Sequence, residues 1–358
     1  MRLRDLFLRL IGRGAVQEVE GTRGRGPVTH VILLDGTRSE LTPGRETSVG
    51  LIYKLLAEGG ARAGRTLYYE AGIQWESWRG TLDVMHGRGL NRQIMRAYGA
   101  LASRYREGDK VFLVGFSRGA YAVRSLAGVI DRVGLIRADC ATERMVTLAY
   151  RHYRAGGSSP AAEAFRQAHC HAEARIEAVA VFDTVKALGS HLPLLWRLTR
   201  HAHAHHNDQL GPATRHGFHA LAYDETREAY APVIWRCPPG WQGHVEQVWF
   251  RGTHGDVGGQ LGGFLPARPL ANIPLVWMLE CLEGCGLELP EGWRARFPTD
   301  VHAPSVGNWR GWSKIFLARK PRAVGRDPSE RLHETLLETL DPSDTRAAPL
   351  LRAVELPN

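Results

Sequence analysis

The sequence predicts an α/β fold: a doubly wound, mostly parallel sheet with helical and loop insertions that are candidates for a lid. Three observations predict it. Apolar runs of strand length alternate with segments of helical periodicity, which is the pattern of parallel strands joined by helices. Several of these runs end in polar or glycine-rich stretches, as strands do at the edge of such a sheet. A length of 358 residues and a hydrophobic fraction of 44% are enough to bury a large sheet.

The expected strands are short apolar runs, and they cover residues 28–37, 65–73, 111–114, 176–189 and 245–263. Between them, apolar residues recur at helical spacing. The expected helices cover residues 48–60, 89–106, 119–134 and 272–286. Strands and helices therefore alternate along most of the chain.

A serine lies between two glycines where one apolar run passes into a helix, in Gly115-Phe116-Ser117-Arg118-Gly119. A sharp strand-to-helix turn lifts such a hydroxyl clear of the sheet, and Gly115 and Gly119 let helix and strand approach closely. The helix N-terminus adds backbone N–H groups and the positive end of a dipole. These features suit a nucleophile whose intermediate is an oxyanion, and they indicate an α/β-hydrolase-like fold. The alternative is a structural turn serine.

A nucleophilic serine needs a histidine base and an acid that orients the base. In this fold class the chain order is serine, acid, histidine, each placed after a strand. The first acid after Ser117 that follows an apolar run is Asp183, and the first such histidine is His254. Asp183 could instead cap a helix, and His254 could be an ordinary loop histidine. Asp256 is the alternative acid, unless it caps the glycine turn that follows it.

An oxyanion hole needs backbone N–H groups from the nucleophile turn and from the loop after an early strand. The loop in LLDGT fits, so we assign Gly36 or Thr37 together with the N–H of Arg118. Asp35 is expected to be structural and to fix this loop, with a metal role as the alternative. The Arg118 side chain could meet a phosphate or form a salt bridge on the first turn of its helix.

The cysteines and histidines give little support for a bound metal or other cofactor, and we expect none. Five cysteines show no paired zinc spacing and read as reduced thiols, and two of them, Cys281 and Cys285, are expected on one helix. The segment HAHAHHN could hold a metal or form an exposed lid loop. Its histidines are His201, His203, His205 and His206.

The net charge of +9 and the pI of about 9.6 favour acidic partners. No nucleic-acid motif is present, so anionic lipid headgroups are the expected partners, and scattered arginines from compositional bias are the alternative. Leu3, Leu6, Phe7 and Leu10 lie at helical spacing among arginines, which fits an interfacial membrane helix, a docked helix or a frayed terminus. Charges interrupt this run and no apolar run reaches 18 residues, which argues against a cleaved signal peptide or a transmembrane helix.

Three segments organise the predicted chain. Residues 1–27 form a basic N-terminal segment and linker, residues 28–320 form the α/β-hydrolase domain, and residues 321–358 form a C-terminal tail or helix. Two insertions are expected within the domain. The first, about residues 138–175, looks helical, and the second, about residues 190–244, is rich in His, Pro and Trp.

Five segments occur in the order VILLDGT, GFSRGAYAVR, VFDTVKALG, HALAYDETREAYAPVIW and VWFRGTHGDVGG. Together they resemble the catalytic domain of type VI secretion phospholipase effectors of the Tle1-like kind, over roughly residues 28–285. The resemblance implies that Ser117, Asp183 and His254 are a catalytic triad. It also implies hydrolysis of a carboxylic ester, with glycerophospholipids as the substrates of the studied effectors.

We therefore expect a serine hydrolase that cleaves carboxylic esters through an acyl-enzyme, and specifically a phospholipase or lipase of the type VI effector kind. The expected partners are an ester substrate such as a glycerophospholipid, an anionic membrane surface, and a secretion-apparatus or immunity protein. The protein is expected to be made in the cytoplasm, and then secreted or held at a membrane. Two alternatives stay open: a general small-ester or thioester hydrolase, and a non-catalytic scaffold that binds a partner through its basic face.

Overall fold

A single sheet forms the centre of the molecule. The structure is a computed structural model that describes residues 17–18, 26–59, 64–72, 88–185, 209–236, 240–309 and 317–355. Within these residues, eight strands pair in the order β1-β3-β2-β4-β5-β6-β7-β8. They are β1 (Gln17–Glu18), β2 (Thr29–Leu34), β3 (Arg65–Glu70), β4 (Lys110–Phe116), β5 (Ile176–Phe182), β6 (Thr214–Ala222), β7 (His244–Phe250) and β8 (Glu330–Leu332). Every pairing is parallel except that of β1 with β3, so the predicted doubly wound α/β fold is confirmed.

The chain changes its winding direction between β2 and β4. It passes from β2 outward to β3, and then returns to place β4 on the other side of β2, from where the sheet grows to β8. In such sheets a crevice opens at the carboxyl edge where the winding direction changes, and ligands bind there. The segments that follow β2 and β4 therefore flank the place where this topology puts a ligand site.

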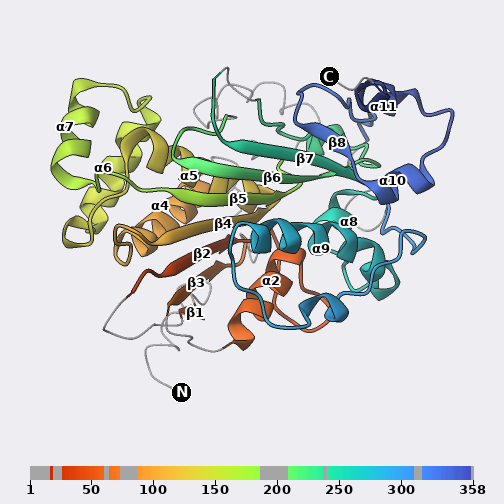
Figure 1. Ribbon diagram of the computed structural model, residues 1–358, viewed down its shortest axis with the longest axis horizontal. Helices are drawn as coiled ribbons and strands as arrows, with labels where there is room; N and C mark the ends of the chain where they lie inside the picture. The colour runs from red at the N-terminus through yellow and green to blue at the C-terminus, as the bar shows by residue number, and fades with distance from the viewer. Residues whose placement is uncertain are drawn as a thin grey trace.

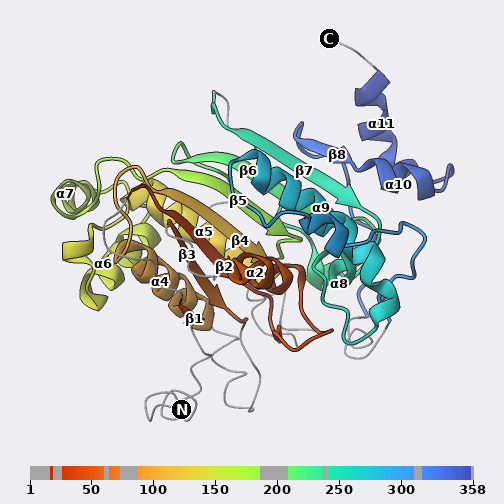
Figure 2. The ribbon, with the colours of Figure 1, turned by 60° about the horizontal axis from the view of Figure 1, so that its bottom comes forward.

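Helices cover both faces of the sheet (Figures 1 and 2). On one face, α4 (Arg88–Ala102) and α5 (Arg118–Val133) pack against the sheet, with α6 (Glu143–Arg154) and α7 (Pro160–His169) beyond them. On the other face lie α2 (Ser48–Glu58) and α9 (Arg268–Gly284). Because both faces are covered, the central strands are apolar on both sides, as in β4, where all residues after Lys110 are buried.

Side-chain caps explain where several of these helices begin. Thr47, Thr142 and Ser159 each accept a hydrogen bond from a backbone N–H in the first turn of α2, α6 and α7. Pro160 then occupies the first position of α7, where its missing N–H costs no helical hydrogen bond. The predicted helical character of residues 138–175 is thus present as α6 and α7. Figure 1 shows them at the end of the molecule opposite α8 (His254–Val257).

The structure differs from the predicted domain organisation in two places. The segment 190–244 is not simply an insertion, because it contains β6, which pairs with β5 and β7 within the sheet. This strand is hard to predict because His219 interrupts its apolar run. His219 is nevertheless fully buried, and it accepts a hydrogen bond from the N–H of Thr184 at 3.1 Å. For the segment 321–358, predicted as a tail or helix, the helical alternative is present as α10 (Glu334–Thr339) and α11 (Ala348–Glu355), but the segment also adds β8 to the sheet.

Some expectations lie outside the described residues. These are the amphipathic segment with Leu3, Leu6, Phe7 and Leu10, and the histidines at 201–206. Within the described ranges, no helix has the length and apolar character needed to cross a membrane.

Candidate active site

Ser117 is the residue at which β4 turns into α5, at the carboxyl edge of the sheet. Its backbone has φ 58° and ψ −118°, a conformation that is strained for any residue with a side chain. The N–H of Ser117 donates to the carbonyl of Phe182 at 3.0 Å, which fixes the turn to the end of β5. This is the strand–turn–helix geometry that the Gly-x-Ser-x-Gly pattern predicts.

The two glycines beside Ser117 are required by close backbone contacts. A Cβ on Gly119 would lie 2.0 Å from the carbonyl oxygen of Leu34, and a Cβ on Gly115 would lie 2.7 Å from the Cα of Ala120. These neighbours are backbone atoms that no rotamer change can move. The first turn of α5 therefore packs directly on the end of β2, as the sequence predicts for these positions.

His254 is the first residue of α8, in the segment that follows β7. Its Nε2 lies 2.9 Å from the Oγ of Ser117, and its Nδ1 lies 2.6 Å from Oδ2 of Asp183. The structure thus brings together the three side chains that the sequence selects, from the ends of three strands. His254 is 3% exposed, so the imidazole is shielded from water and its two ring nitrogens lie beside these two partners.

Asp256, the alternative acid, has another role. Its Oδ2 accepts the N–H and hydroxyl of Thr253, in a capping box at the start of α8, and the hydroxyl of Ser305. Its Oδ1 accepts the N–H of Val306 at 2.8 Å. The carboxylate therefore positions the helix that carries His254, and the carboxylate that lies beside Nδ1 of the imidazole is that of Asp183.

Asp183 leaves the sheet beside Ser117 because Phe116 of β4 and Phe182 of β5 are paired in register. Its backbone has a φ of 39°, and its Oδ1 accepts the N–H of Ala222 at 3.1 Å. The side chain is fully buried. An acid in this position can orient the histidine only if its own charge is balanced, because an isolated buried carboxylate is costly.

Arg322 supplies that balance. Its Nη1 lies 2.5 Å from Oδ1 of Asp183 and its Nη2 lies 2.9 Å from Oδ2, in a two-pronged contact. The same guanidinium donates to the carbonyls of Ala222 at 2.9 Å and Tyr230 at 2.6 Å. Sequence reasoning missed Arg322 because it lies in the segment expected to be a tail, as one of many scattered arginines.

These contacts set the protonation states. Burial alone would raise the pKa of Asp183, but the charge of Arg322 and hydrogen bonds from His254 and Arg322 hold it well below its usual value. Burial lowers the pKa of His254, against the opposing hydrogen bond and charge of Asp183. At neutral pH the imidazole therefore donates its Nδ1–H to Asp183, and Nε2 is left to accept the hydroxyl proton of Ser117.

Asp35 fixes the loop after β2. Its Oδ1 accepts the N–H of Gly36 at 2.6 Å, and its Oδ2 accepts the hydroxyls of Thr47 at 2.7 Å and Tyr69 at 2.8 Å. Burial raises the pKa of Asp35 to about 6, against the lowering effect of these hydrogen bonds. The Asp35 contacts are those of a structural residue.

The predicted oxyanion donors divide into two groups. The N–H of Gly36 is used by Asp35, so the structure does not leave Gly36 as a free donor. The backbone N–H groups of Thr37 and Arg118 have no hydrogen-bond acceptor within the described residues. Thr37 follows β2 and Arg118 follows Ser117, so both lie at the edge where the winding direction changes.

The ring of Phe116 joins the three segments of the site. A Cβ on Gly36 would lie 2.6 Å from this ring, and a Cβ on Gly258, just after α8, would lie 1.9 Å from it. The centroids of the Phe116 and His254 rings are 4.8 Å apart. The loop after β2, the nucleophile turn and the segment with His254 are therefore packed around one fully buried side chain.

Further charged groups surround His254. Its N–H donates to Oε2 of Glu225 at 3.1 Å, and Glu225 forms a buried ion pair with Arg227 at 2.6 Å. The Arg227 guanidinium lies 3.9 Å from the ring centroid of Tyr230, whose ring meets the imidazole edge-on at 4.8 Å. The half-buried Arg118 side chain has no hydrogen-bond or ion-pair partner within the described part of the chain.

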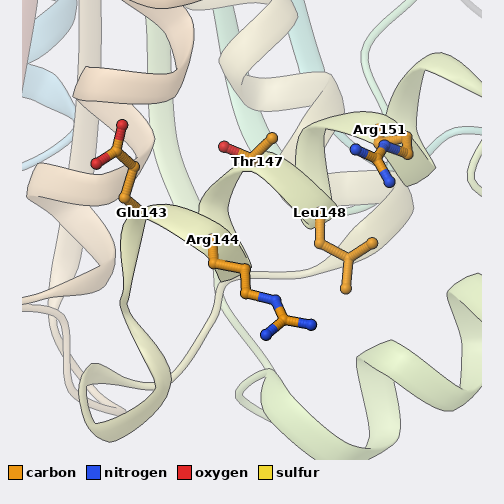
Figure 3. A pocket seen from close by; sticks show the side chains of 5 residues that line it. All are labelled: Glu143, Arg144, Thr147, Leu148 and Arg151. Carbon is orange, nitrogen blue, oxygen red and sulfur yellow. The ribbon is translucent and has the colours of Figure 1, made fainter.

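Two other features lie away from this constellation. Figure 3 shows a groove on α6 lined by Glu143, Arg144, Thr147, Leu148 and Arg151, none of which is a candidate site residue. In the described ranges, no three His, Cys, Asp or Glu side chains gather in a way that could hold a metal ion. Four of the five cysteines are free thiols, and Cys237 lies outside the described residues.

The sequence of this chain is similar to a known protein family and to a yeast protein. The family model described as the catalytic domain of Tle1-like type VI secretion phospholipase effectors matches residues 29–281. Uncharacterized protein YEL023C of Saccharomyces cerevisiae is 27% identical over 268 residues, which cover 66% of this chain and 38% of that protein. The chain therefore spans well under half the length of that relative.

The solved structures to which this chain is similar include a Tle1 effector bound to the VgrG spike of the type VI secretion system. It is 16% identical with a TM-score of 0.40, and the match covers 68% of this chain and 53% of that one. Another is esterase 2 of Thermogutta terrifontis, which is 13% identical with a TM-score of 0.37, covering 77% of this chain and 91% of that one.

Proposed function

This chain belongs to the family of Tle1-like phospholipase effector catalytic domains, and from that premise we propose that it is a serine hydrolase that cleaves carboxylic esters of glycerophospholipids. The observation that carries the proposal is the chain of two hydrogen bonds from Ser117 through His254 to Asp183. It supports nucleophilic catalysis because the base reaches the hydroxyl and the acid holds the base in the required tautomer.

In the proposed reaction, the Oγ of Ser117 attacks the ester carbonyl carbon while Nε2 of His254 takes the hydroxyl proton. The carbonyl oxygen becomes an oxyanion that accepts the N–H groups of Thr37 and Arg118. The tetrahedral intermediate then collapses, the C–O bond breaks, and the leaving alcohol takes the proton from His254. Water, activated by the same imidazole, releases the carboxylic acid from the acyl-enzyme and restores the serine.

The Arg118 side chain supports a substrate with an anionic group. It follows the nucleophile directly, it is half-buried, and no described carboxylate neutralises it. A guanidinium in that position can hold a phosphate through paired hydrogen bonds. The phosphodiester of a glycerophospholipid lies close to both of its ester bonds, so one bound molecule can satisfy Arg118 and present an ester to Ser117.

Delivery by a type VI secretion apparatus is part of the proposal, because the family is one of effectors and a Tle1 effector structure contains the VgrG spike. A membrane surface and an immunity protein are the further partners proposed with it. A small-ester or thioester hydrolase with a housekeeping role is the second candidate. The same triad favours it equally, because the triad itself does not select the alcohol or thiol that leaves.

The first experiment compares the protein with its Ser117→Ala variant on two substrates. One is a short-chain p-nitrophenyl ester, and the other is vesicles of phosphatidylglycerol or phosphatidylethanolamine, assayed for free fatty acid. We expect turnover of both, lowered about 10⁴- to 10⁶-fold in the variant. Ester cleavage without lipid turnover would favour the housekeeping hydrolase. Turnover of neither substrate, or turnover that survives in Ser117→Ala, would contradict the proposal.

A further inference from the structure

Arg322 lies outside the part of the chain that matches the family model, which ends at residue 281. It nevertheless makes the closest charged contact to the candidate acid, with both carboxylate oxygens of Asp183 engaged at 2.5 and 2.9 Å. Both side chains are buried, Arg322 at 3% exposure and Asp183 at 0%. A cation held this close in a dry environment acts strongly on every proton bound nearby.

The backbone on both sides of Arg322 is fixed, so its position is built into the fold. The N–H of Lys320 donates to the carbonyl of Thr226 at 2.7 Å, and the N–H of Glu228 donates to the carbonyl of Ala318 at 3.1 Å. This short antiparallel pairing lays the segment 318–320 beside the segment that carries Glu225 and Arg227. Beyond Arg322, β8 continues the sheet next to β7.

The effect of Arg322 on the base follows from the coupling within the pair. A carboxylate beside an imidazole stabilises the protonated ring, and a cation beside that carboxylate cancels part of this effect. Asp183 and His254 share a hydrogen bond of 2.6 Å, so their protons are bound by the pair. Removing a positive charge from the far side of Asp183 must increase the affinity of the pair for a proton.

The other groups that face His254 do not replace this charge. Glu225 and Arg227 form their own ion pair, and their opposite charges shift the pKa of His254 in opposite directions. Ser117 and Tyr230 also contact the imidazole, and Asp183 carries the carboxylate that is hydrogen-bonded to it. These are the titratable and charged side chains in contact with the histidine or its backbone, or interacting with its charge, within the described residues.

We propose that Arg322 is a positioning residue for the reaction, which clamps the carboxylate of Asp183 and keeps His254 unprotonated to lower pH than Asp183 alone would allow. This inference rests on the proposed function, because it assigns Asp183 and His254 to the reaction. It also means that the segment after residue 317 contributes to the proposed reaction, although the match to the family model ends at residue 281.

Two variants separate charge from contact. Arg322→Gln removes the charge and keeps hydrogen-bond donors, whereas Arg322→Lys keeps the charge and loses the two-pronged contact. The matched control is Arg124→Gln, which changes another buried arginine, one that donates to the carbonyl of Val233 and stacks on Trp235. For each variant, kcat/KM is measured against pH on a p-nitrophenyl ester, and His254 is titrated by NMR with nitrogen-15-labelled histidine.

The expected results differ between the variants. In Arg322→Gln, the acid limb of the kcat/KM profile and the His254 midpoint both move up by about one pH unit, so activity below the limb falls about tenfold. In Arg322→Lys, the limb stays in place while kcat falls at all pH values, because the carboxylate is held less well. Arg124→Gln lowers the melting temperature without moving the limb.

A folded Arg322→Gln protein with an unmoved His254 midpoint would overturn the proposal. If Arg322→Gln fails to fold, Arg322→Lys provides the test. A displaced acid limb or an undiminished kcat in Arg322→Lys would contradict the proposal. The NMR titration needs no substrate. A protein without Ser117-dependent turnover therefore refutes the proposed function, while the His254 midpoint still tests the role of Arg322.

Discussion

Three residues other than glycine have positive φ in the described part of the chain, and all three lie at one edge of the sheet. They are Arg38, Ser117 and Asp183, and they follow β2, β4 and β5. Each costs of order 1–3 kcal/mol, so such residues persist only where the surroundings fix them. The strain gathers where the candidate nucleophile, its acid and the oxyanion loop meet, which is what a site that depends on precise side-chain directions requires.

Substitutions distinguish the role of Asp183 in the reaction from the structural role of Asp256. In Asp183→Asn, the histidine loses the carboxylate that holds its tautomer, and buried Arg322 loses its counter-charge. We expect kcat to fall about 1,000- to 10,000-fold, together with a lower melting temperature. In Asp256→Asn, we expect kcat to change little and the free energy of unfolding to fall by about 1–3 kcal/mol, because the donors it accepts are left unpaired. Equal losses of kcat in both variants would contradict the assignment.

Arg118→Gln tests the anionic substrate. Loss of a charge-assisted hydrogen bond to phosphate should lower kcat/KM on phosphatidylglycerol vesicles about 10- to 100-fold. Activity on a neutral p-nitrophenyl ester should stay within a factor of about three. The control is Arg132→Gln in the last turn of the same helix, for which we expect no change on either substrate. A parallel fall on both substrates would mean that the Arg118 side chain supports the turn and not the phosphate.

The sequence predicts the residues of the candidate triad because each one lies at or shortly after the end of an apolar run, and the ends of parallel strands meet at one edge of the sheet. The choice between Asp183 and Asp256 was harder, since both are near a strand end. It is decided by register: Phe116 pairs with Phe182, which places residues 117 and 183 side by side. Arg322 had no such signal, because nothing local marks a long-range ion pair.

At the scale of elements, the packing of α5 on β2 is the contact that fixes the nucleophile turn. We expect Gly119→Ala to abolish soluble expression or to cost more than about 3 kcal/mol, because its Cβ would lie 2.0 Å from the carbonyl of Leu34. The control is Gly99→Ala in α4, where the nearest atom is the side chain of Val146 at 3.5 Å.

That control should raise the free energy of unfolding by about 0.5–1 kcal/mol, since alanine favours the helix. Thermal and denaturant unfolding of both variants provide the measurement. A Gly119→Ala protein as stable as the wild type would mean that α5 and β2 can separate.

The strands that sequence reasoning missed share a physical cause. β6 is central, but its buried His219 and its Gly217 make it look polar, and the histidine is tolerated because it bonds to Thr184 and Gln247. β8 has three residues, which is too short for any periodicity to show. Each of these strands is held by partners far away in the sequence, and single-sequence patterns carry no record of them.

At the scale of the whole molecule, buried titratable groups predict how stability depends on pH. Burial and the charge of Arg124 lower the pKa of His219 from 6.5 to about 3, so the folded protein excludes a proton that the unfolded chain binds. This contribution to stability is complete above about pH 6.5 and is lost progressively as the pH falls toward 3. Asp35, with its pKa raised to about 6, acts in the opposite direction and offsets part of the loss.

These two contributions oppose each other between about pH 6 and 3.8, so the role of His219 is measured as a difference between two proteins. We expect the melting temperature of His219→Gln to rise relative to that of the wild type as the pH falls from 6.5 toward 3, because an amide can accept from Thr184 and donate to Gln247 without titrating. Calorimetric melting curves of both proteins across this range provide the measurement. A difference that does not change with pH would assign the dependence to other groups.

The contact between Arg322 and Asp183 also has a consequence for how the protein is made. A ribosome releases Ser117, Asp183 and His254 in that order, and Arg322 emerges only after all three. Until then the carboxylate of Asp183 has no Arg322 guanidinium beside it, and β7 has no β8 beside it. The proposed hydrolase would therefore reach its full activity at low pH only after residue 322 has been made and has folded against Asp183.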